Sequence, residues 1–364
     1  MAKGNLAVLT GGGDCPGLNA VIRAVVKTAL NNDYAIYGIA NGFHGLIAGD
    51  MELLSLRDVS GILPLGGTVL GTTNRDNPFH YFSGEDAKGN AIYKDMRKVV
   101  VKNLQSRNIE CLVVIGGDGS LNIAAELSRE CGVKVVGVPK TIDNDLPCTE
   151  RTFGFDTAMS MATEALDRLH TTAEAHHRVM CLEVMGRYAG WIALHSGIAG
   201  GADCILIPEI PYKLDAIIAK IRERQRQGKA FSIVTVAEGA KPLGGEMTVA
   251  RMVKDSFEPI RLGGVGEKLS RDIEAATGIE SRCTVLGYLQ RGGSPTPYDR
   301  VLATRYGVRA VEAYVAGEYN VMVALQANKI ITVPIAKVAS EPHQVDPSSD
   351  IVQCAKQIGI CFGD

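Results

Sequence analysis

The stretch from Cys111 to Asp145 constrains the fold most, because its pattern predicts a strand, a helix and a second strand in direct succession. The run CLVVI is short and apolar and stops at two glycines, as a buried parallel strand does. The segment SLNIAAELSREC then has apolar residues at helical spacing, with Ser120 as its candidate N-cap. The apolar run VKVVGV follows, and the unit as a whole predicts a parallel sheet in an α/β fold.

An acidic turn follows each of these two predicted strands. Asp118 comes directly after the first strand, and the turn from Thr141 to Asp145 comes after the second. If the strands are parallel neighbours, their carboxyl ends share one edge of the sheet, which is where ligands bind in open α/β sheets. Gly117 and Gly119 let the backbone approach an anion, and Asp118 supplies a carboxylate for a divalent cation. Aspartates are also common in solvated turns, so the convergence of the turns is what favours a phosphate and metal site.

A glycine-rich turn, GGGDCPGLN, follows the predicted N-terminal strand LAVLT and precedes a helix that runs to Leu30. Glycines permit positive φ and let backbone amides point at a phosphate. The turn does not match a dinucleotide fingerprint, because Pro16 stands where the third small residue belongs. On this motif alone, a tight turn without a ligand and a phosphate-binding turn both remain open. Further on, NGFHGL is predicted to be a loop that carries Phe43.

Two motifs together point to a known family. GGDGS and, downstream, PKTIDND are similar to segments of the 6-phosphofructokinase family, and further motifs in chain order extend the resemblance over nearly the whole chain. GGDG by itself also resembles NAD kinases and diacylglycerol kinases, which do not carry PKTIDND. The resemblance implies two Rossmann-like three-layer α/β lobes with mainly parallel sheets. It also implies transfer of the terminal phosphoryl group of ATP to the 1-hydroxyl of fructose 6-phosphate in glycolysis.

The resemblance implies roles for the turns of the first lobe. Asp143 would be the general base that takes the proton from the 1-hydroxyl, Thr141 would help to position the substrate, and Asp118 would organise Mg²⁺. Asp145 would be a supporting carboxylate, and an aromatic residue at the position of Phe43 lies near the adenine in relatives. The residues expected to contact the phosphoryl donor are Gly12, Gly13, Arg75, Gly117, Asp118, Gly119 and Ser120.

Two residues bear on the identity of the donor and point in opposite directions. Gly119 leaves room for the α-phosphate and nucleoside of ATP, whereas pyrophosphate-using members of the family commonly carry an aspartate there. Lys140, expected to act in catalysis beside the leaving phosphate, is lysine in pyrophosphate enzymes and glycine in many bacterial ATP enzymes. Lysine also occurs in some ATP-using relatives, so the sequence favours ATP. A pyrophosphate-dependent fructose 6-phosphate 1-phosphotransferase is the alternative, and a catalytically silent sugar-phosphate-binding subunit is a second.

The second lobe is expected to bind fructose 6-phosphate. MGRYAG, which follows the predicted strand HRVMCLEVM, is another turn at a ligand-binding edge, and the resemblance also gives Arg187 the role of stabilising charge on the transferred phosphoryl group. Arg282 and Arg291 suit a sugar phosphate, because guanidinium groups bind phosphate oxygens in a bidentate manner. Tyr288 stands where relatives often have histidine. The resemblance places at the substrate Thr141, Asp143, Asp145, Arg178, Met185, Gly186, Arg187, Glu238, Arg282, Tyr288 and Arg291.

The chain length of 364 residues also favours two lobes, because it exceeds one typical core. We expect residues 1–155, with about 293–335 returning, to form the donor and Mg²⁺-phosphate lobe. Residues 156–292, with the tail at about 336–364, would form the fructose 6-phosphate lobe. The resemblance has Arg178 and Arg282 reach the 6-phosphate of the adjacent subunit's substrate, which implies a homodimer or homotetramer with shared active sites. The segment from Lys241 to Glu280 predicts an insertion relative to short bacterial enzymes.

The composition argues against several other classes of function. A net charge of -2 provides no basic field for nucleic acid. No stretch is long and apolar enough to predict a membrane span, and MAKGNLAVLT does not have the pattern of a signal peptide. The nine cysteines include no CxxC pair and are expected to be reduced thiols. We therefore expect a cytoplasmic enzyme whose partners are ATP or pyrophosphate and fructose 6-phosphate.

Overall fold

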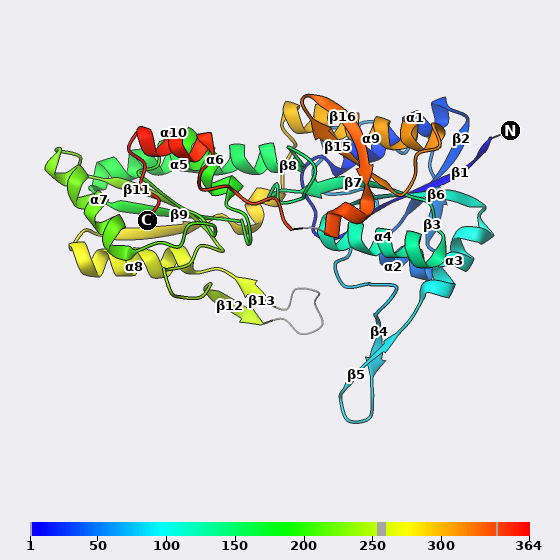
Figure 1. The fold of residues 1–364 in the computed structure, drawn as a ribbon, viewed down its shortest axis with the longest axis horizontal. Coiled ribbons are helices and arrows are strands. Elements are labelled where there is room, and N and C mark those ends of the chain that lie inside the picture. The colour runs from blue at the N-terminus through cyan, green and yellow to red at the C-terminus, as the bar shows by residue number, and fades with distance from the viewer. Residues whose placement is uncertain (1, 253–259, 340) are drawn as a thin grey trace.

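The computed structural model describes residues 2–252, 260–339 and 341–364, and it contains two mainly parallel sheets flanked by helices (Figure 1). The first sheet has the order β16-β15-β7-β6-β1-β2-β3, and β8 pairs with β7 beside this path. Only β3 and β16 pair antiparallel to their neighbours. The strands are β1 (Gly4–Thr10), β2 (Tyr34–Ile39), β3 (Met51–Leu53), β6 (Ile109–Gly116), β7 (Val135–Thr141), β8 (Phe153–Gly154), β15 (Val321–Gln326) and β16 (Lys329–Pro334).

The central strands of this sheet are buried on both faces, which explains why they are apolar without interruption. Leu6 and Val8 of β1 pack in the cluster formed with α1, whereas the alternate residues Ala7 and Leu9 pack in the cluster that contains Leu121 of α4. One face is covered by α1 (Leu18–Asn31) and α9 (Pro297–Val315), and the other by α2 (Phe43–Ala48), α3 (Arg97–Ser106) and α4 (Asp118–Cys131). The predicted parallel strand at CLVVI is the middle of β6.

The second sheet is entirely parallel and has the order β10-β11-β9-β14. Its strands are β9 (Val179–Val184), β10 (Cys204–Leu206), β11 (Ser232–Ala237) and β14 (Ser281–Val285). The helices α5 (Phe155–His176), α6 (Trp191–Ala199) and α10 (Asp350–Gln357) lie on one side, and α7 (Leu214–Arg226) and α8 (Val265–Thr277) lie on the other (Figure 1). The predicted α/β fold with two three-layer lobes is therefore confirmed.

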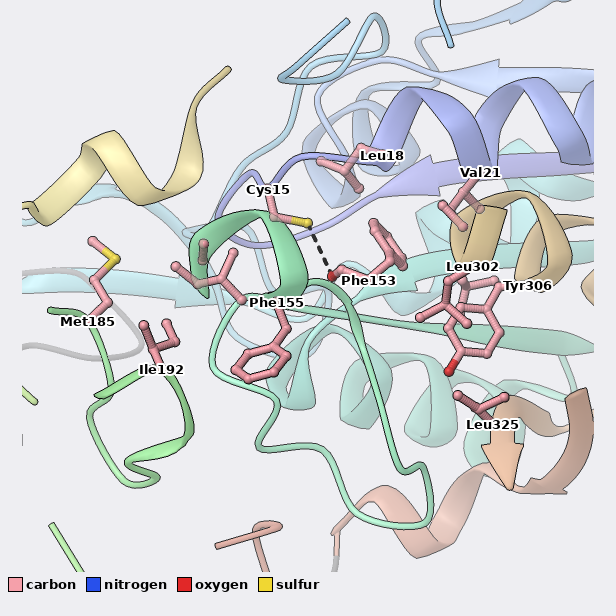
Figure 2. Close-up of a cluster of buried hydrophobic side chains, with 14 of the residues drawn as sticks. Cys15, Leu18, Val21, Phe153, Phe155, Met185, Ile192, Leu302, Tyr306 and Leu325 are labelled. Carbon is pink, nitrogen blue, oxygen red and sulfur yellow. Dashed lines mark hydrogen bonds between the residues drawn. The ribbon is translucent and has the colours of Figure 1, made fainter. Parts of the chain in front are cut away.

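One hydrophobic core runs from the first sheet to the second. Figure 2 shows Leu18 of α1, Tyr306 of α9, Phe155 of α5 and Ile192 of α6 in the same buried cluster. A buried ionisable group adds to this connection, because Asp299 at the start of α9 accepts hydrogen bonds from the backbone N–H and the hydroxyl of Thr157 in α5, at 2.8 and 2.6 Å. The two lobes are thus joined by helices of each lobe that pack against one another.

Two local predictions are wrong. Ser120 is not an N-cap: α4 begins at Asp118 with Gly117 as its cap residue, because the extended conformation of Gly117 lets the acidic side chain enter the first turn, where the helix dipole stabilises it. Phe43 is not in a loop but opens α2, and only 2% of it is exposed in the core beneath the first sheet. Burial of its apolar ring in that core contributes free energy of folding that an exposed loop would not provide.

The remaining elements are small additions to the two sheets. A hairpin of β4 (Tyr81–Glu85) and β5 (Ala91–Lys94) projects from the first lobe in Figure 1. The predicted insertion at 241–280 contains β12 (Val249–Met252), β13 (Ile260–Leu262) and α8, and its residues 253–259 lie outside the described part of the chain. The short helices η1 (Gly287–Arg291) and η2 (Ile335–Ala339) complete the fold. Among the described helices, none is sufficiently long and apolar to cross a membrane.

The crossing of α1 and α9 generates a stability prediction. A Cβ added to Gly307 of α9 would lie 2.7 Å from both the Cβ of Ala24 and the carbonyl oxygen of Val21 in α1. Gly307→Ala should therefore lower the free energy of unfolding by about 1–3 kcal/mol through overpacking, although alanine is the better helix former. Thermal unfolding measures this effect. Gly119→Ala is the matched control, because no atom lies within 4 Å of an added Cβ in that helix, and equal midpoints for the two variants would contradict the prediction.

Candidate active site

Three turns meet at one edge of the first sheet because β6 pairs in parallel with β1 and with β7. The glycine turn after β1, the Asp118 turn after β6 and the acidic turn after β7 therefore lie side by side. The backbone N–H of Gly11 donates to the carbonyl of Ile115 at 2.9 Å, which continues the β1–β6 pairing into the first turn. Gly12 has φ +79°, a left-handed conformation that glycine adopts without strain.

Lys140 lies at the end of β7 and connects two of these turns. Its ammonium group donates to the carbonyl of Gly13 at 2.6 Å, and only 7% of the residue is exposed. Burial, assisted by the nearby guanidinium of Arg291, lowers the pKa of Lys140, while the carboxylates of Asp118 and Asp145 oppose that shift. A cation therefore stands between the glycine turn and the acidic turn.

The acidic turn presents carboxylates whose ionisation is disfavoured. Burial raises the pKa of Asp143, and the carboxylates of Asp145 and Glu238 raise it further, against the effect of Arg291 and Lys140. Burial also raises the pKa of Asp145, with a second contribution from the charge of Asp118 and an opposing hydrogen bond from Thr141. The Oδ1 atom of Asp143 is shielded from solvent and accepts no hydrogen bond from any described residue, so it is available to a hydroxyl of a substrate.

The second sheet contributes two turns, and Glu238 in one of them lies close enough to the acidic turn for its charge to raise the pKa of Asp143. Gly186 has φ +136°, and a Cβ there would lie 2.8 Å from the carbonyl oxygen of Ala189, so only glycine fits this turn. The backbone N–H of Met185 donates to Oε1 of Gln290 at 2.8 Å. Glu238 follows β11, and the N–H of the next residue, Gly239, donates to the carbonyl of Gly186 at 3.1 Å. The Met185–Arg187 turn and the Glu238 turn are therefore held together.

Arg291 brings the second half of the chain to the glycine turn of the first sheet. Its Nη1 atom packs so closely on Gly13 that a Cβ at this glycine would lie 1.8 Å away. The guanidinium is also 6.0 Å from the ring centroid of Tyr288, a residue that is 71% exposed. Arg187 makes a similar contact, with its guanidinium 5.0 Å from the centroid of Tyr188. Arg291 lies close enough to Asp143 for its charge to lower the pKa of that carboxyl group, and a guanidinium at this place suits the binding of phosphate groups.

Among the predicted donor residues, Asp118, Gly119 and Arg75 are exposed, whereas Ser120 is buried. Asp118 and Gly119 are exposed at the start of α4, and nothing lies within 4 Å of a Cβ added to Gly119. Arg75 is exposed on a loop that is tied to the glycine turn, because the N–H of Gly12 donates to the carbonyl of Thr73 at 3.0 Å. Ser120 is 7% exposed and turns its hydroxyl toward Gly11.

Arg178 and Arg282 are not brought to this cluster. Arg178 directly precedes β9, and Arg282 is the second residue of β14, so both lie at the amino ends of these strands. The Met185–Arg187 turn follows the carboxyl end of β9. Six strand residues separate the two ends of β9, or about 20 Å. Instead, both arginines form ion pairs with Glu280, at 2.8 Å for Arg178 and 2.5 Å for Arg282.

Two residues that hold the backbone of this site were not predicted from the sequence. Gln290 is completely buried and fixes the backbone of Met185, and its position directly before Arg291 in a turn-rich block was the available signal. His343, in the C-terminal tail, hydrogen-bonds to the backbone of the acidic turn, and no motif surrounds it.

The carboxylates also fit a divalent cation of the kind that the sequence suggested. Asp118 and Asp145 are close enough for the charge of one to raise the pKa of the other. Within the described residues no group of three or more histidine, cysteine or acidic side chains could hold a metal by itself. The pair of Asp118 and Asp145 suits Mg²⁺, because this ion is usually bound by one or two carboxylates together with waters and substrate phosphates.

Comparison with known proteins gives consistent matches. The family model described as Phosphofructokinase matches residues 5–314. The ATP-dependent 6-phosphofructokinase 2 of Clostridium perfringens is 55% identical over 361 residues, which cover 99% of this chain and 98% of that protein. The pyrophosphate–fructose 6-phosphate 1-phosphotransferase of Streptomyces coelicolor is 48% identical over 359 residues, covering 98% of this chain and 99% of that protein.

A solved structure of a related enzyme shows the same fold. The phosphofructokinase of Pichia pastoris in the T-state superposes with a TM-score of 0.80 and 29% identity over 93% of this chain, which spans only 38% of that longer chain. The family model covers most of the sequence, and the relatives with about half of their residues identical match from end to end. The chain therefore belongs to the phosphofructokinase family and is an enzyme of that family.

Proposed function

We propose that the protein transfers the terminal phosphoryl group of ATP to the 1-hydroxyl of fructose 6-phosphate. The observation that carries the proposal is the buried Oδ1 of Asp143, which has no described hydrogen-bond partner and belongs to a carboxyl group of raised pKa. A general base is most effective when its pKa approaches the working pH, so this carboxyl is suited to accept the proton of a hydroxyl. The names of the relatives supply the substrates: one is an ATP-dependent 6-phosphofructokinase.

In the proposed reaction, Asp143 takes the proton as the sugar oxygen forms a bond to the γ-phosphorus. The bond between that phosphorus and the bridging oxygen breaks, and ADP leaves with the electron pair. Little covalent chemistry is needed from the protein, because phosphoryl transfer is catalysed mainly by positioning and charge stabilisation. Lys140, Arg187 and Arg75 would supply positive charge around the transferred group, and Thr141 would orient the acidic turn through its hydrogen bond from the N–H of Asp143 at 3.1 Å.

Asp118, with Asp145 behind it, would hold Mg²⁺ at the donor phosphates. When bound, the ion would neutralise phosphate charge and orient the phosphoryl chain. The glycine turn at Gly12 and Gly13 and the N-terminal amides of α4 would bind the phosphate oxygens.

Gly119 is the observation that favours ATP over pyrophosphate. No atom lies within 4 Å of a Cβ added to Gly119, so a nucleotide can occupy this space without displacing a side chain. Lys140 is compatible with either donor, because its ammonium is already held by the carbonyl of Gly13. Pyrophosphate is the second candidate, since a relative of nearly the same identity bears the name of the pyrophosphate enzyme.

The arrangement of the sheets supports a division of labour between the lobes. The first sheet with α9 would bind the donor and Mg²⁺, and the second sheet with the C-terminal tail would bind fructose 6-phosphate. Arg178 and Arg282 lie at the far end of the second sheet and would serve the 6-phosphate of a neighbouring subunit's substrate, in a homodimer or homotetramer with shared active sites. The reaction belongs in the cytoplasm, where the nine free thiols would remain reduced.

The direct test is formation of fructose 1,6-bisphosphate from fructose 6-phosphate and Mg²⁺, with ATP and with pyrophosphate in parallel assays. Turnover with ATP supports the proposal. Turnover with pyrophosphate alone would replace the donor, and no turnover with either, while fructose 6-phosphate still binds, would identify a silent sugar-phosphate-binding subunit.

The donor assignment predicts the effect of Gly119→Asp. The new carboxylate would stand in the open space beside the donor, so ATP-dependent kcat/KM should fall roughly 100-fold or more through steric and charge repulsion. Thermal unfolding should stay unchanged, because no atom of the protein is displaced. Gly119→Ala is the matched control and should keep most ATP-dependent activity. Full activity of the aspartate variant with ATP would remove Gly119 from the donor site.

The base assignment predicts that Asp143→Asn keeps the shape of the side chain and loses the proton acceptor. We expect kcat to fall by about 10²–10⁴ while the affinity for fructose 6-phosphate, measured by calorimetry, changes little. A variant with near-normal kcat would show that another group takes the proton.

The raised pKa of Asp143 predicts a pH dependence. The carboxylate is the active form, so kcat/KM should fall with decreasing pH already above the ordinary aspartate pKa of about 3.9. The negative charge of Glu238 contributes to the rise, so Glu238→Gln should lower the pKa of Asp143 and move the acid limb to lower pH, whatever its effect on maximal rate. The pH profile of kcat/KM measures this, and a limb that stays in place or moves to higher pH would contradict it.

A further inference from the structure

The C-terminal tail passes from the first lobe to the second between η2 and α10 (Figure 1). Along this path, three consecutive residues, His343, Gln344 and Val345, hydrogen-bond to elements of both lobes. We call these three residues the strap. It lies between the turn that carries the predicted base and the turn that carries Arg187.

On the side of the first lobe, the strap holds the backbone of the acidic turn. The N–H of His343 donates to the carbonyl of Asp145 at 2.8 Å, and its Nδ1 lies 3.0 Å from the carbonyl of Asn144. A carbonyl oxygen can only accept, so Nδ1 carries the ring proton. Burial lowers the pKa of His343, and the hydrogen bond to Asn144 opposes that shift. Asn144 has φ +53°, a left-handed conformation that asparagine adopts more readily than most residues other than glycine.

On the side of the second lobe, the strap holds the residues that follow Arg187. The indole Nε1–H of Trp191 donates to the carbonyl of His343 at 2.8 Å, and the side-chain amide of Gln344 donates to the carbonyl of Tyr188 at 2.8 Å. The carboxylate of Glu209 accepts from the N–H of Val345 at 2.8 Å and from that of Gly190 at 3.0 Å.

Apolar packing alone does not account for this arrangement. Val345 is buried at 2% exposure and the rings of Trp191 and His343 lie 4.8 Å apart, so packing does anchor the tail. However, the polar contacts end on the backbone of the acidic turn, on the residues that directly follow the Met185–Arg187 turn, or on Glu209, which holds one of those residues. The single residue His343 contacts both segments, through its N–H and ring at the acidic turn and through its carbonyl, which accepts from Trp191, on the other side.

We propose that His343 is a positioning residue that fixes the acidic turn relative to the Met185–Arg187 turn, so that the base and the phosphoryl-stabilising cation are held in register across the two lobes. The inference rests on the proposed function, because it assigns the strap to the same reaction. The two turns belong to different sheets, and a misplacement of about 1 Å can cost on the order of 10²-fold in rate when catalysis depends on positioning.

The decisive experiment compares His343→Asn with His343→Asp. The amide of asparagine can donate to the Asn144 carbonyl from nearly the position of Nδ1, whereas an ionised aspartate of the same size can only accept. We expect the asparagine variant to keep kcat within about threefold of the unmodified enzyme, and the aspartate variant to lose roughly 10- to 100-fold in kcat. KM for fructose 6-phosphate should change far less than kcat in both. Equal kcat values for the two variants would overturn the proposal.

A second variant keeps the test independent of His343 itself. Trp191→Phe preserves an aromatic ring but removes the donor to the His343 carbonyl, and it should lower kcat in the same manner although Trp191 lies in the other lobe. His177→Asn is the matched control, because this exposed histidine has φ +56°, which asparagine tolerates, and it should behave as the unmodified enzyme. A Trp191→Phe enzyme with unchanged kcat would contradict a strap that joins both turns.

Amide hydrogen exchange on the ligand-free protein gives a readout that does not require activity. In His343→Asp, exchange should become faster both at 143–145 and at 188–191, and it should stay unchanged at these segments in His177→Asn. Faster exchange at one segment only would show that the strap does not couple the turns. If the unmodified protein transfers no phosphoryl group but the exchange result holds, the proposed function fails and the structural coupling stands.

Discussion

In the first sheet, β6 pairs in parallel with β1 on one side and with β7 on the other, and these pairings set where each strand ends. The glycine turn, the Asp118 turn and the acidic turn lie next to one another for that reason alone. A shift of one residue in either pairing would reverse the faces of every side chain in the shifted strand and would move its turn by about 3.3 Å. The apolar cores on both faces of the sheet make such a shift costly. Backbone pairing and core packing thus bring the three turns together without a contribution from side-chain polar contacts between them.

The site that results contains like charges that the fold alone does not neutralise. The charges of Asp145 and Glu238 disfavour ionisation of Asp143, and the charge of Asp118 disfavours ionisation of Asp145, while Lys140 and Arg291 compensate only in part. A buried arrangement of this kind stabilises a protein poorly without its ligands. It is suited instead to ligands that bring a hydroxyl, phosphate oxygens and a divalent cation. The strap acts on the backbone instead, because it ties the acidic turn to the residues that follow Arg187 in the other lobe.

Much of this architecture could be predicted from the sequence, for reasons that differ between elements. The strands at LAVLT and CLVVI are almost entirely apolar and are followed by glycines and an aspartate, so both the sheet edge and its turns could be predicted. Phe43 was misplaced because a helix of six residues has too few positions to show a period, and Ser120 because Gly117 could cap the helix earlier. The strap could not be predicted: its contacts are mostly made by backbone groups, which every residue possesses, and they join segments about 150 to 200 positions apart.

The open space beside Gly119 has a consequence for the evolution of such chains. A Cβ at this position has no atom within 4 Å beyond its own helix, so close packing does not restrict the position to glycine. Glycine and aspartate codons can differ by a single base. If Gly119 selects the donor as proposed, a single mutation could therefore change the phosphoryl donor from ATP to pyrophosphate, or the reverse, without a change of fold.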